Sequence, residues 1–292
     1  NGKKLFGYEG DTIASALIAN GIHLVGRSFK YHRPRGFFGA GVEEPNAKLQ
    51  VEFNGHSEPN VNATEMELVE GLSATSQNCW PSVNFDIGAI NNFLKMFFPA
   101  GFYYKTFMWP KSFWYKIYEP FIRKAAGLGV ASLEKDKERY EHKFEYCDLL
   151  VTGSGPSGLA SAYAAAKNGA KVILAEDKPR FGGTLLTDDV SIDNLSGKDW
   201  AEKIVSELKS MPNVTVKNRS QVFGYYDHNM LVMFERISDH LEKKSKFTPR
   251  QRLWYIRAKE TILSTGSIER PIVFGNNDTP GIFLSAAAKE YI

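Results

Sequence analysis

Residues 147–158 read CDLLVTGSGPSG, and this stretch decides the fold of the second half of the chain. The apolar run at 149–151 is typical of a buried parallel strand. Gly153, Gly155 and Gly158 follow in the G-x-G-x-x-G spacing. The first glycine permits a tight turn, the second lets the backbone approach a pyrophosphate, and the third lets a helix pack closely on the strand. The stretch therefore predicts the strand, turn and helix of a dinucleotide-binding Rossmann unit.

The residues that follow extend the same pattern. Residues 159–169 favour a helix, and its N-terminus would direct free N–H groups and a positive dipole end at phosphates. A second strand at 171–176 ends at Glu176, near the position where an acid bonds the adenosine ribose hydroxyls. A carboxylate would repel a 2′-phosphate, so NAD or FAD is favoured over NADP. Lys178 and Arg180 weaken that preference, because either could reach a 2′-phosphate.

Three later segments fit a two-dinucleotide flavoprotein fold. The glycine pair in FGGT at 181–184 can lie against a cofactor, and a strand at 261–266 ends in Thr265 and Gly266. Val222 lies just beyond a third strand. A backbone group near Val222 could contact the adenine edge, and hydrophobic packing is an equally good interpretation of this residue.

Size and composition limit the possible classes. The chain has 292 residues, which suggests two domains, and its net charge of +3 is too small to indicate a nucleic-acid partner. Two cysteines, Cys79 and Cys147, favour a reducing compartment, and we expect a cytoplasmic protein. The sequence does not begin with Met, and its last residues read as the start of a helix, so we expect a fragment of a longer polypeptide.

The first 84 residues predict a small α+β domain. Asp11 or Thr12 would cap a short helix over residues 13–18. Residues 48–54 alternate like a strand that runs into a turn, and residues 65–69 could form another strand.

Residues 85–121 are rich in aromatic side chains, with 14 Phe, Tyr or Trp among 37 positions. Prolines and lysines interrupt the run, so we reject a membrane span. The segment either packs irregularly over its own domain or covers a partner subunit, and both interpretations stay open. The charged residues 132–146 are interpreted as a solvated helix or linker. The expected domains are therefore 1–84, a connecting segment at 85–145, and 146–292.

Five further motifs resemble one known family. They are GRSFKYHRPRG at 26–36, NCWP at 78–81, PAGFYYKTFMWP at 99–110, GYYDHN at 224–229 and PRQRLW at 249–254. These segments are similar to the alpha subunits of bacterial heterotetrameric sarcosine oxidases. The resemblance implies a β-grasp, ferredoxin-like domain followed by a Rossmann-type FAD/NAD-binding domain. It also implies that the chain is roughly the first third of a subunit whose remainder binds tetrahydrofolate.

The family's reaction is the oxidative demethylation of sarcosine to glycine, with hydrogen peroxide and either formaldehyde or 5,10-methylenetetrahydrofolate. The resemblance implies NAD bound by this chain, with FAD and FMN on or shared with the beta subunit. It further implies gamma and delta subunits as partners and a small amine as substrate. Relatives with a [2Fe–2S] cluster need Cys-x4-Cys-x2-Cys, and that spacing lands here on Gly39, Glu44 and Ala47. We therefore expect a cluster-free domain, with no iron–sulfur cluster and no other metal.

The resemblance places Ser157, Glu176, Asp177, Lys178, Thr184 and Val222 at the family's NAD contacts. With the residues identified above, the candidate cofactor-binding set is Gly153, Gly155, Pro156, Ser157, Gly158, Glu176, Asp177, Lys178, Gly183, Thr184, Val222, Thr265 and Gly266. No catalytic residue is assigned. Two other functions stay open: a free-standing FAD-dependent oxidoreductase or related amine oxidase subunit, and a scaffold that binds nucleotide without using it.

Overall fold

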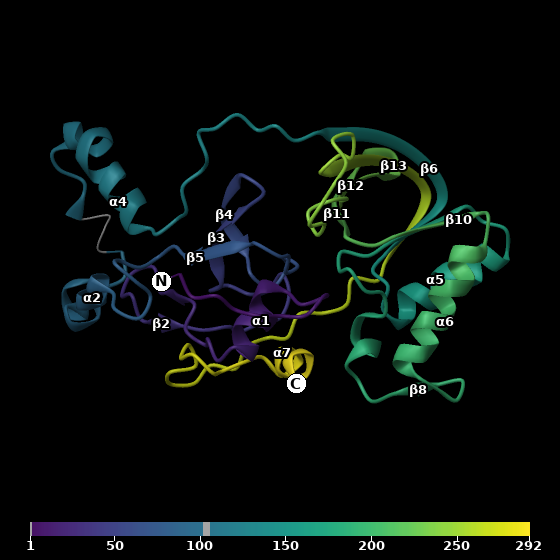
Figure 1. Cartoon of the computed structure of the whole chain (residues 1–292), viewed down its shortest axis with the longest axis horizontal. Helices are drawn as coiled ribbons and strands as arrows, with labels where there is room; N and C mark the ends of the chain where they lie inside the picture. The colour runs from purple at the N-terminus through teal and green to yellow at the C-terminus, as the bar shows by residue number, and fades with distance from the viewer. Residues whose placement is uncertain (1, 102–105) are drawn as a thin grey trace. The chain divides into compact units, whose positions relative to one another are not determined.

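The computed structural model describes residues 2–101 and 106–292, and the chain divides into two compact units (Figure 1). Unit 1 comprises Asn1–Asp136 together with Glu269–Ile292, and unit 2 comprises Lys137–Ile268. This division differs from the expected domains at two places. Residues 269–292 belong with unit 1, and the first strand of unit 2 begins at Tyr140, before the expected boundary and directly after the charged residues 134–139, which form no helix or strand.

Unit 1 is built from short elements around a small sheet. Strand β3 is central, between β4 and β5, and both of its neighbours are antiparallel to it. The described elements are α1 (Ile13–Ala19), β1 (Gly26–Arg27), β2 (Pro34–Arg35), β3 (Lys48–Phe53), β4 (His56–Asn62), β5 (Ser73–Ser76), η1 (Ile87–Ala89), α2 (Ile90–Phe93), η2 (Lys95–Phe97), η3 (Lys111–Phe113), η4 (Trp114–Tyr118), α4 (Glu119–Ala125) and α7 (Ser285–Tyr291).

The local predictions for unit 1 are confirmed at α1 and β3. Thr12 caps α1, because its hydroxyl accepts from the Ser15 N–H while the Ser15 hydroxyl accepts from the Thr12 N–H. The strand expected at 65–69 is wrong. The Glu65 and Met66 N–H groups both donate to the Asn62 carbonyl, which makes a turn there, and β5 forms later in the chain.

The core of unit 1 explains why the C-terminal residues pack there. Ile13, Phe37 and Leu49 are among its buried side chains, and Phe283 and Tyr291 pack against this core. The Leu284 N–H donates to the Phe38 carbonyl, and the Tyr291 hydroxyl donates to the Gly39 carbonyl. These apolar and polar contacts hold residues 283–291 against unit 1.

Unit 2 carries a six-stranded mixed sheet in the order β10-β7-β6-β13-β12-β11. The first four strands in this order are parallel, and β12 and β11 continue it as antiparallel strands. The elements are β6 (Tyr140–Thr152), α5 (Pro156–Lys167), β7 (Val172–Ala175), η5 (Gly183–Leu186), β8 (Ser191–Ile192), β9 (Leu195–Ser196), α6 (Gly197–Ser210), β10 (Val214–Lys217), β11 (Ser220–Tyr226), η6 (Asp227–Asn229), β12 (Met230–Arg236) and β13 (Gln251–Leu263).

Alternating side chains of β6 and β7 build two cores. Leu149, Val151 and Val172 face α5 and α6, which lie side by side (Figure 1). Leu150 and Ile173 face the opposite way and pack with side chains of β12 and β13. Because successive side chains of a strand point to opposite faces, a fully apolar strand here means that both faces of the sheet are covered.

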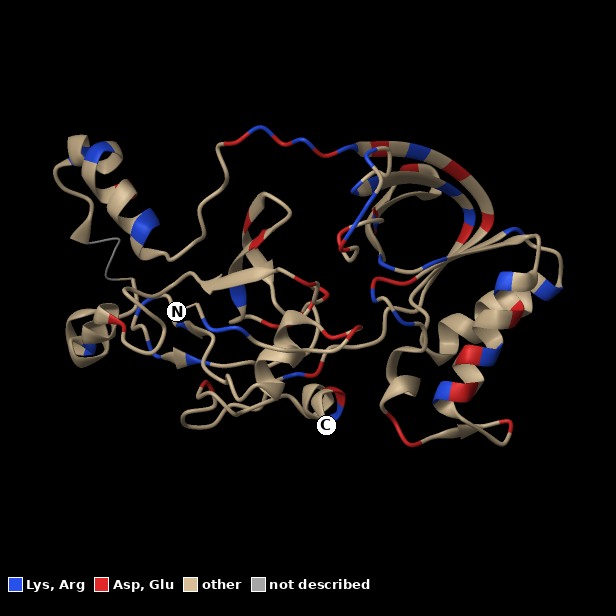
Figure 2. Ribbon diagram, viewed as in Figure 1, with Lys and Arg blue, Asp and Glu red and all other residues tan. Residues whose placement is uncertain are grey.

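Charged residues lie along the first half of β6 and on the outer face of α6 (Figure 2). Residues 140–146, expected to be solvated helix or linker, pair with β13 instead, for example Phe144 with Tyr255. In the part of the chain that the structure describes, no helix is long and apolar enough to cross a membrane.

Candidate nucleotide-binding site

The turn after β6 has the geometry that the three glycines predict. Gly153 has a φ of +95°, which disfavours any other residue, and a Cβ there would lie 2.2 Å from the Ser264 carbonyl oxygen. A Cβ on Gly158 would lie 2.0 Å from the Gly153 carbonyl oxygen. By contrast, a Cβ on Gly155 would meet no atom within 4 Å. The turn therefore needs Gly153 and Gly158 for its own packing and leaves open space over Gly155.

The N-terminus of α5 faces this open space without a side-chain cap. Gly155 is the N-cap residue, and as a glycine it has no side chain to accept from the first-turn amides. Pro156 occupies the first helical position, where its missing N–H costs nothing. Ser157 is exposed in the same turn. The uncapped amides and the positive end of the helix dipole can together bind an anion such as a diphosphate.

Glu176 directly follows β7, and its carboxylate is bound by the turn after β6. Its Oε2 accepts from the Ser154 N–H at 2.8 Å and from the Ser154 hydroxyl at 2.5 Å, while its Oε1 accepts from the Lys178 N–H at 3.0 Å. Burial and the neighbouring Asp177 raise the pKa of Glu176 to about 7. The carboxyl group is thus fixed beside the turn, and its charge changes near neutral pH.

The glycine pair at the start of η5 also reaches the turn. Gly183 has a φ of +55°, and a Cβ on it would lie 3.0 Å from the Gly155 Cα. Thr184 follows on η5 and is exposed. Gly182 and Gly183 therefore let their backbone pass close to the backbone of Gly155, beside the open space over that residue.

The end of β13 completes the surroundings of the turn. The Ser264 N–H donates to the Thr152 carbonyl, and Gly153 packs against the Ser264 carbonyl. Thr265 and Gly266 follow directly and are exposed. The structure therefore brings together the turn at 153–158, the glycine pair and the end of β13.

The other predicted residues, Asp177, Lys178 and Val222, have different surroundings. Asp177 and Lys178 follow Glu176 and are partly exposed, and Arg236 donates to the Asp177 carbonyl. Val222 lies in β11, opposite Met233 on β12, and packs against the buried cluster that contains Leu150. The packing interpretation therefore accounts for its side chain.

Ser154 is the main residue that the sequence reasoning missed. It is fully buried at the first variable position of the glycine motif, where the pattern alone assigns no role. Its hydroxyl donates to Glu176 and accepts from the Gly182 N–H at 3.1 Å. The available signal in the sequence was a serine placed between Gly153 and Gly155, upstream of the acid at 176.

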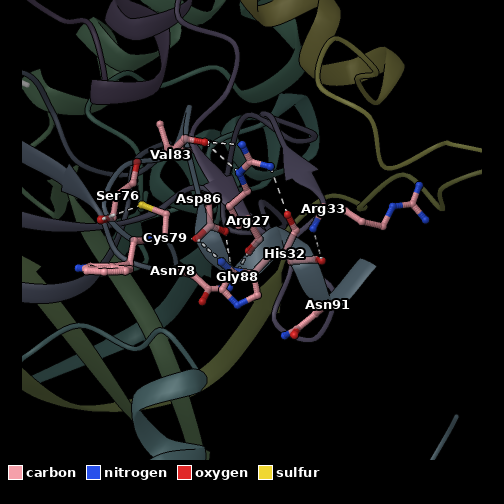
Figure 3. A network of polar contacts seen from close by, with 12 residues as sticks. Arg27, His32, Arg33, Ser76, Asn78, Cys79, Val83, Asp86, Gly88 and Asn91 are labelled. Atoms are coloured by element: carbon pink, nitrogen blue, oxygen red, sulfur yellow. Dashed lines mark hydrogen bonds and ion pairs between the residues drawn. The ribbon is translucent and has the colours of Figure 1, made fainter. Parts of the chain in front are cut away.

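Unit 1 contains a separate polar network (Figure 3). The His32 ring lies 2.6 Å from the Asp86 carboxylate, which also accepts from the Trp80 and Gly88 N–H groups. Arg27 donates to the carbonyls of Val83 and His32. The bonds that Arg27 and His32 make with Val83 and Asp86 hold the segment at 78–91 against the hairpin of β1 and β2.

The arginines of the RPR motif form structural ion pairs. Arg33 lies 2.9 Å from one carboxylate oxygen of Asp278, and Arg35 contacts the other. Both arginines are therefore paired with one carboxylate of the same unit. Across residues 2–101 and 106–292, no group of three or more His, Cys, Asp or Glu side chains could hold a metal ion.

Family comparisons agree with the two-unit fold. Residues 1–79 match the family described as 2Fe-2S iron-sulfur cluster binding domain, and residues 148–232 match that described as FAD dependent oxidoreductase. The L-proline dehydrogenase of P. horikoshii has a similar fold, with a TM-score of 0.60 and 20% identity over 99% of this chain and 44% of that one. The predicted ferredoxin-like and Rossmann-type folds are thereby confirmed, and unit 2 contains an oxidoreductase domain.

The match at residues 1–79 corrects the expectation of no iron–sulfur cluster, because the domain is related to cluster-binding domains. A cluster of the plant type is held by four thiolates, and the chain has two cysteines, one in each unit. At the expected ligand positions, the buried Glu44 carboxylate accepts from four backbone N–H groups, those of Phe38, Gly39, Asn46 and Ala47. These residues do not fit a four-thiolate cluster.

Sequence comparison finds relatives that match this chain over its full length. It is 52% identical over 292 residues to sarcosine oxidase subunit alpha of Rhizobium meliloti (strain 1021), and 34% identical over 297 residues to that of Corynebacterium sp. (strain U-96). The chain spans 30% and 26% of the lengths of these relatives. Over its full length, the chain is thus a homologue of the N-terminal part of sarcosine oxidase alpha subunits.

Proposed function

We propose that unit 2 binds NAD at the turn of residues 153–158. The observation that supports this most directly is the open position over Gly155, bordered by the uncapped start of α5 and by Gly183. The diphosphate would bind the first-turn amides of α5, and the ribose hydroxyls would donate to Glu176 or Asp177. Ser157, Lys178 and Thr184 would contact the rest of the nucleotide.

The complete protein, we propose, is the alpha subunit of an oxidase that demethylates sarcosine. Sarcosine, oxygen and water would give glycine, formaldehyde and hydrogen peroxide, or 5,10-methylenetetrahydrofolate where tetrahydrofolate takes the formaldehyde carbon. The proposed FAD and FMN, on or shared with a beta subunit, would supply the redox chemistry by accepting two electrons from the substrate amine and passing them to oxygen. The identity to two sarcosine oxidase alpha subunits supports this proposal. The described part of this chain would contribute nucleotide binding and subunit contact.

FAD at the same turn is a second candidate, because residues 148–232 match an FAD dependent oxidoreductase family. Identification of the nucleotide distinguishes the two. The purified complex should release about one NAD per alpha chain on heating, measured by mass spectrometry. A Gly155→Ala variant, purified in parallel, should release much less NAD and the same amount of flavin. Equal loss of FAD in that variant would contradict the NAD assignment.

The sarcosine assignment is tested by activity. The complex should consume oxygen with sarcosine and produce equimolar glycine. A complex that is inert with sarcosine and active with another secondary amine would reject the substrate and leave the nucleotide proposal standing.

The aromatic segment at 85–121, we propose, contacts another subunit of the complex. Residues 102–105 lie outside the described residues, and many of the remaining large apolar side chains are exposed, including Phe93 at 85% and Tyr115 at 83%. The relatives are named as subunit alpha, which implies other subunits. The charged side chains of the described segment are mostly lysines, so a partner surface with an acidic rim would complement it.

A further inference from the structure

One buried hydroxyl joins three segments at the proposed nucleotide site. Ser154, with 0% of its surface exposed, donates its hydroxyl to Glu176 Oε2 at 2.5 Å and accepts from the Gly182 N–H at 3.1 Å. Its own N–H donates to the same carboxylate oxygen at 2.8 Å. The turn after β6, the end of β7 and Gly182 at the start of η5 therefore meet at this residue.

These bonds set the position of groups that would touch the nucleotide. Gly182 precedes Gly183, on which a Cβ would lie 3.0 Å from the Gly155 Cα, so the bond from Gly182 to Ser154 helps to hold Gly183 beside the Gly155 backbone. The two bonds to Oε2 hold the Glu176 side chain in one orientation. An alanine at 154 would keep the packing and would leave the buried Gly182 N–H without its acceptor.

The ionisable surroundings of Glu176 are simple. Asp177 is its ionisable neighbour and raises the pKa of Glu176, whereas Lys178 contributes its backbone N–H and Lys217 its backbone carbonyl. Burial is the largest cause that raises this pKa, and the Ser154 bond lowers it. Removing the hydroxyl would therefore make Glu176 harder to ionise.

We propose that Ser154 is a positioning residue for the dinucleotide, orienting the Glu176 carboxylate toward the ribose and fixing the Gly182–Gly183 turn beside the diphosphate. This inference rests on the proposed NAD site. It adds a residue that touches no nucleotide atom itself and acts through two groups that would.

The test is NAD titration of the full complex by calorimetry from about pH 6 to about pH 9, after removal of bound nucleotide. Ser154→Ala should bind NAD about tenfold more weakly at neutral pH, as expected for loss of a buried hydrogen bond to a charged group. The pH midpoint of binding should also move upward, because Glu176 then ionises at higher pH. Ser206→Ala, an exposed serine on α6, is the matched control and should match the wild type.

Ser154→Cys replaces the hydroxyl with a slightly larger thiol that is a weak donor, and it should recover part of the affinity and part of the midpoint. A Ser154→Ala variant with unchanged affinity and midpoint would overturn the inference. Weaker binding with an unmoved midpoint would also overturn it, because it would show a purely structural role. Failure of the wild type to bind NAD at any pH would instead reject the proposed function.

Discussion

Gly155 and Gly158 lie three residues apart and differ in what a methyl group would meet. A Cβ on Gly155 has no neighbour within 4 Å, and the residue has a φ of −63°, so alanine is compatible with the fold. Gly155→Ala should leave the free energy of unfolding within about 0.5 kcal/mol of wild type and lower NAD affinity at least about tenfold. Chemical denaturation and NAD titration of the same preparation measure both.

Gly158→Ala is the opposite case. Its Cβ would lie 2.0 Å from the Gly153 carbonyl oxygen, and backbone cannot move aside cheaply. We expect destabilisation of about 1–3 kcal/mol in addition to loss of NAD binding. The assignment of separate roles to the two glycines would be contradicted if both variants lost stability equally.

Glu176 makes the proposed site sensitive to pH. Burial raises the pKa of this carboxyl to about 7, so the group is neutral below that pH and charged above it. If the carboxylate accepts from ribose hydroxyls, NAD affinity should fall as the pH decreases through about 7 and level off above about 8. Glu176→Gln should remove this dependence and bind weakly throughout.

The matched control for that experiment is Glu202→Gln, since Glu202 is exposed on α6. It should keep the wild-type pH profile. A wild-type affinity that stays constant between about pH 6 and about pH 8 would show that the Glu176 charge takes no part in binding.

At the element scale, residues 269–292 are held on unit 1 partly by charge. Burial alone would raise the pKa of Asp278, but the guanidinium groups of Arg35 and Arg33 hold it below its ordinary value of 3.8. A depressed carboxyl pKa adds stability above the ordinary pKa, and that stability is lost as the pH falls through the folded value. Asp278→Asn should weaken the attachment by about 1 kcal/mol at neutral pH.

Hydrogen exchange over residues 269–292 measures this attachment. Exchange should be faster in Asp278→Asn than in wild type at neutral pH, and the difference should shrink as the pH falls below about 4. Glu70→Gln, an exposed acid of the same unit, should behave as wild type. Identical exchange in Asp278→Asn and wild type at neutral pH would show that apolar contacts alone hold the segment.

The elements that the sequence predicted well are those fixed by neighbouring residues. The α1 cap, the strand at 48–53 and the run from β6 through α5 to β7 each depend on short-range patterns. The packing of α7 on unit 1 depends on contacts such as Tyr291 with Gly39, which are 252 positions apart. No local pattern reports such a contact. The pairing of residues 140–146 with β13 was also not predicted, because the charged composition of these residues favours a solvated segment.

The residues of the candidate site were likewise predictable where short-range patterns determine their geometry. The glycines and Glu176 could be named because their spacing in sequence reflects a fixed local geometry. Ser154 acquires its role from Gly182, which lies 28 positions away, and that bond becomes visible only in three dimensions.

For the whole molecule, the exposed side chains of the aromatic segment at 85–121 predict assembly with other subunits. Phe93→Ser combined with Tyr115→Ser should weaken association with the partner subunits at least about tenfold, because exposed aromatic residues contribute strongly when an interface buries them. The melting temperature of the isolated alpha chain should not change. Val273→Ser, which removes another exposed apolar side chain, is the control. Unimpaired assembly of the double variant would place the subunit contact elsewhere.

The proposed site requires a dinucleotide bound at the start of α5, and a structure of the complete complex determined with saturating NAD tests this requirement. We predict the diphosphate within hydrogen-bonding distance of the amides of residues 155–158, and the adenosine ribose beside Glu176 and Asp177. NAD bound elsewhere on the complex, or FAD in this position under the same conditions, would contradict the account.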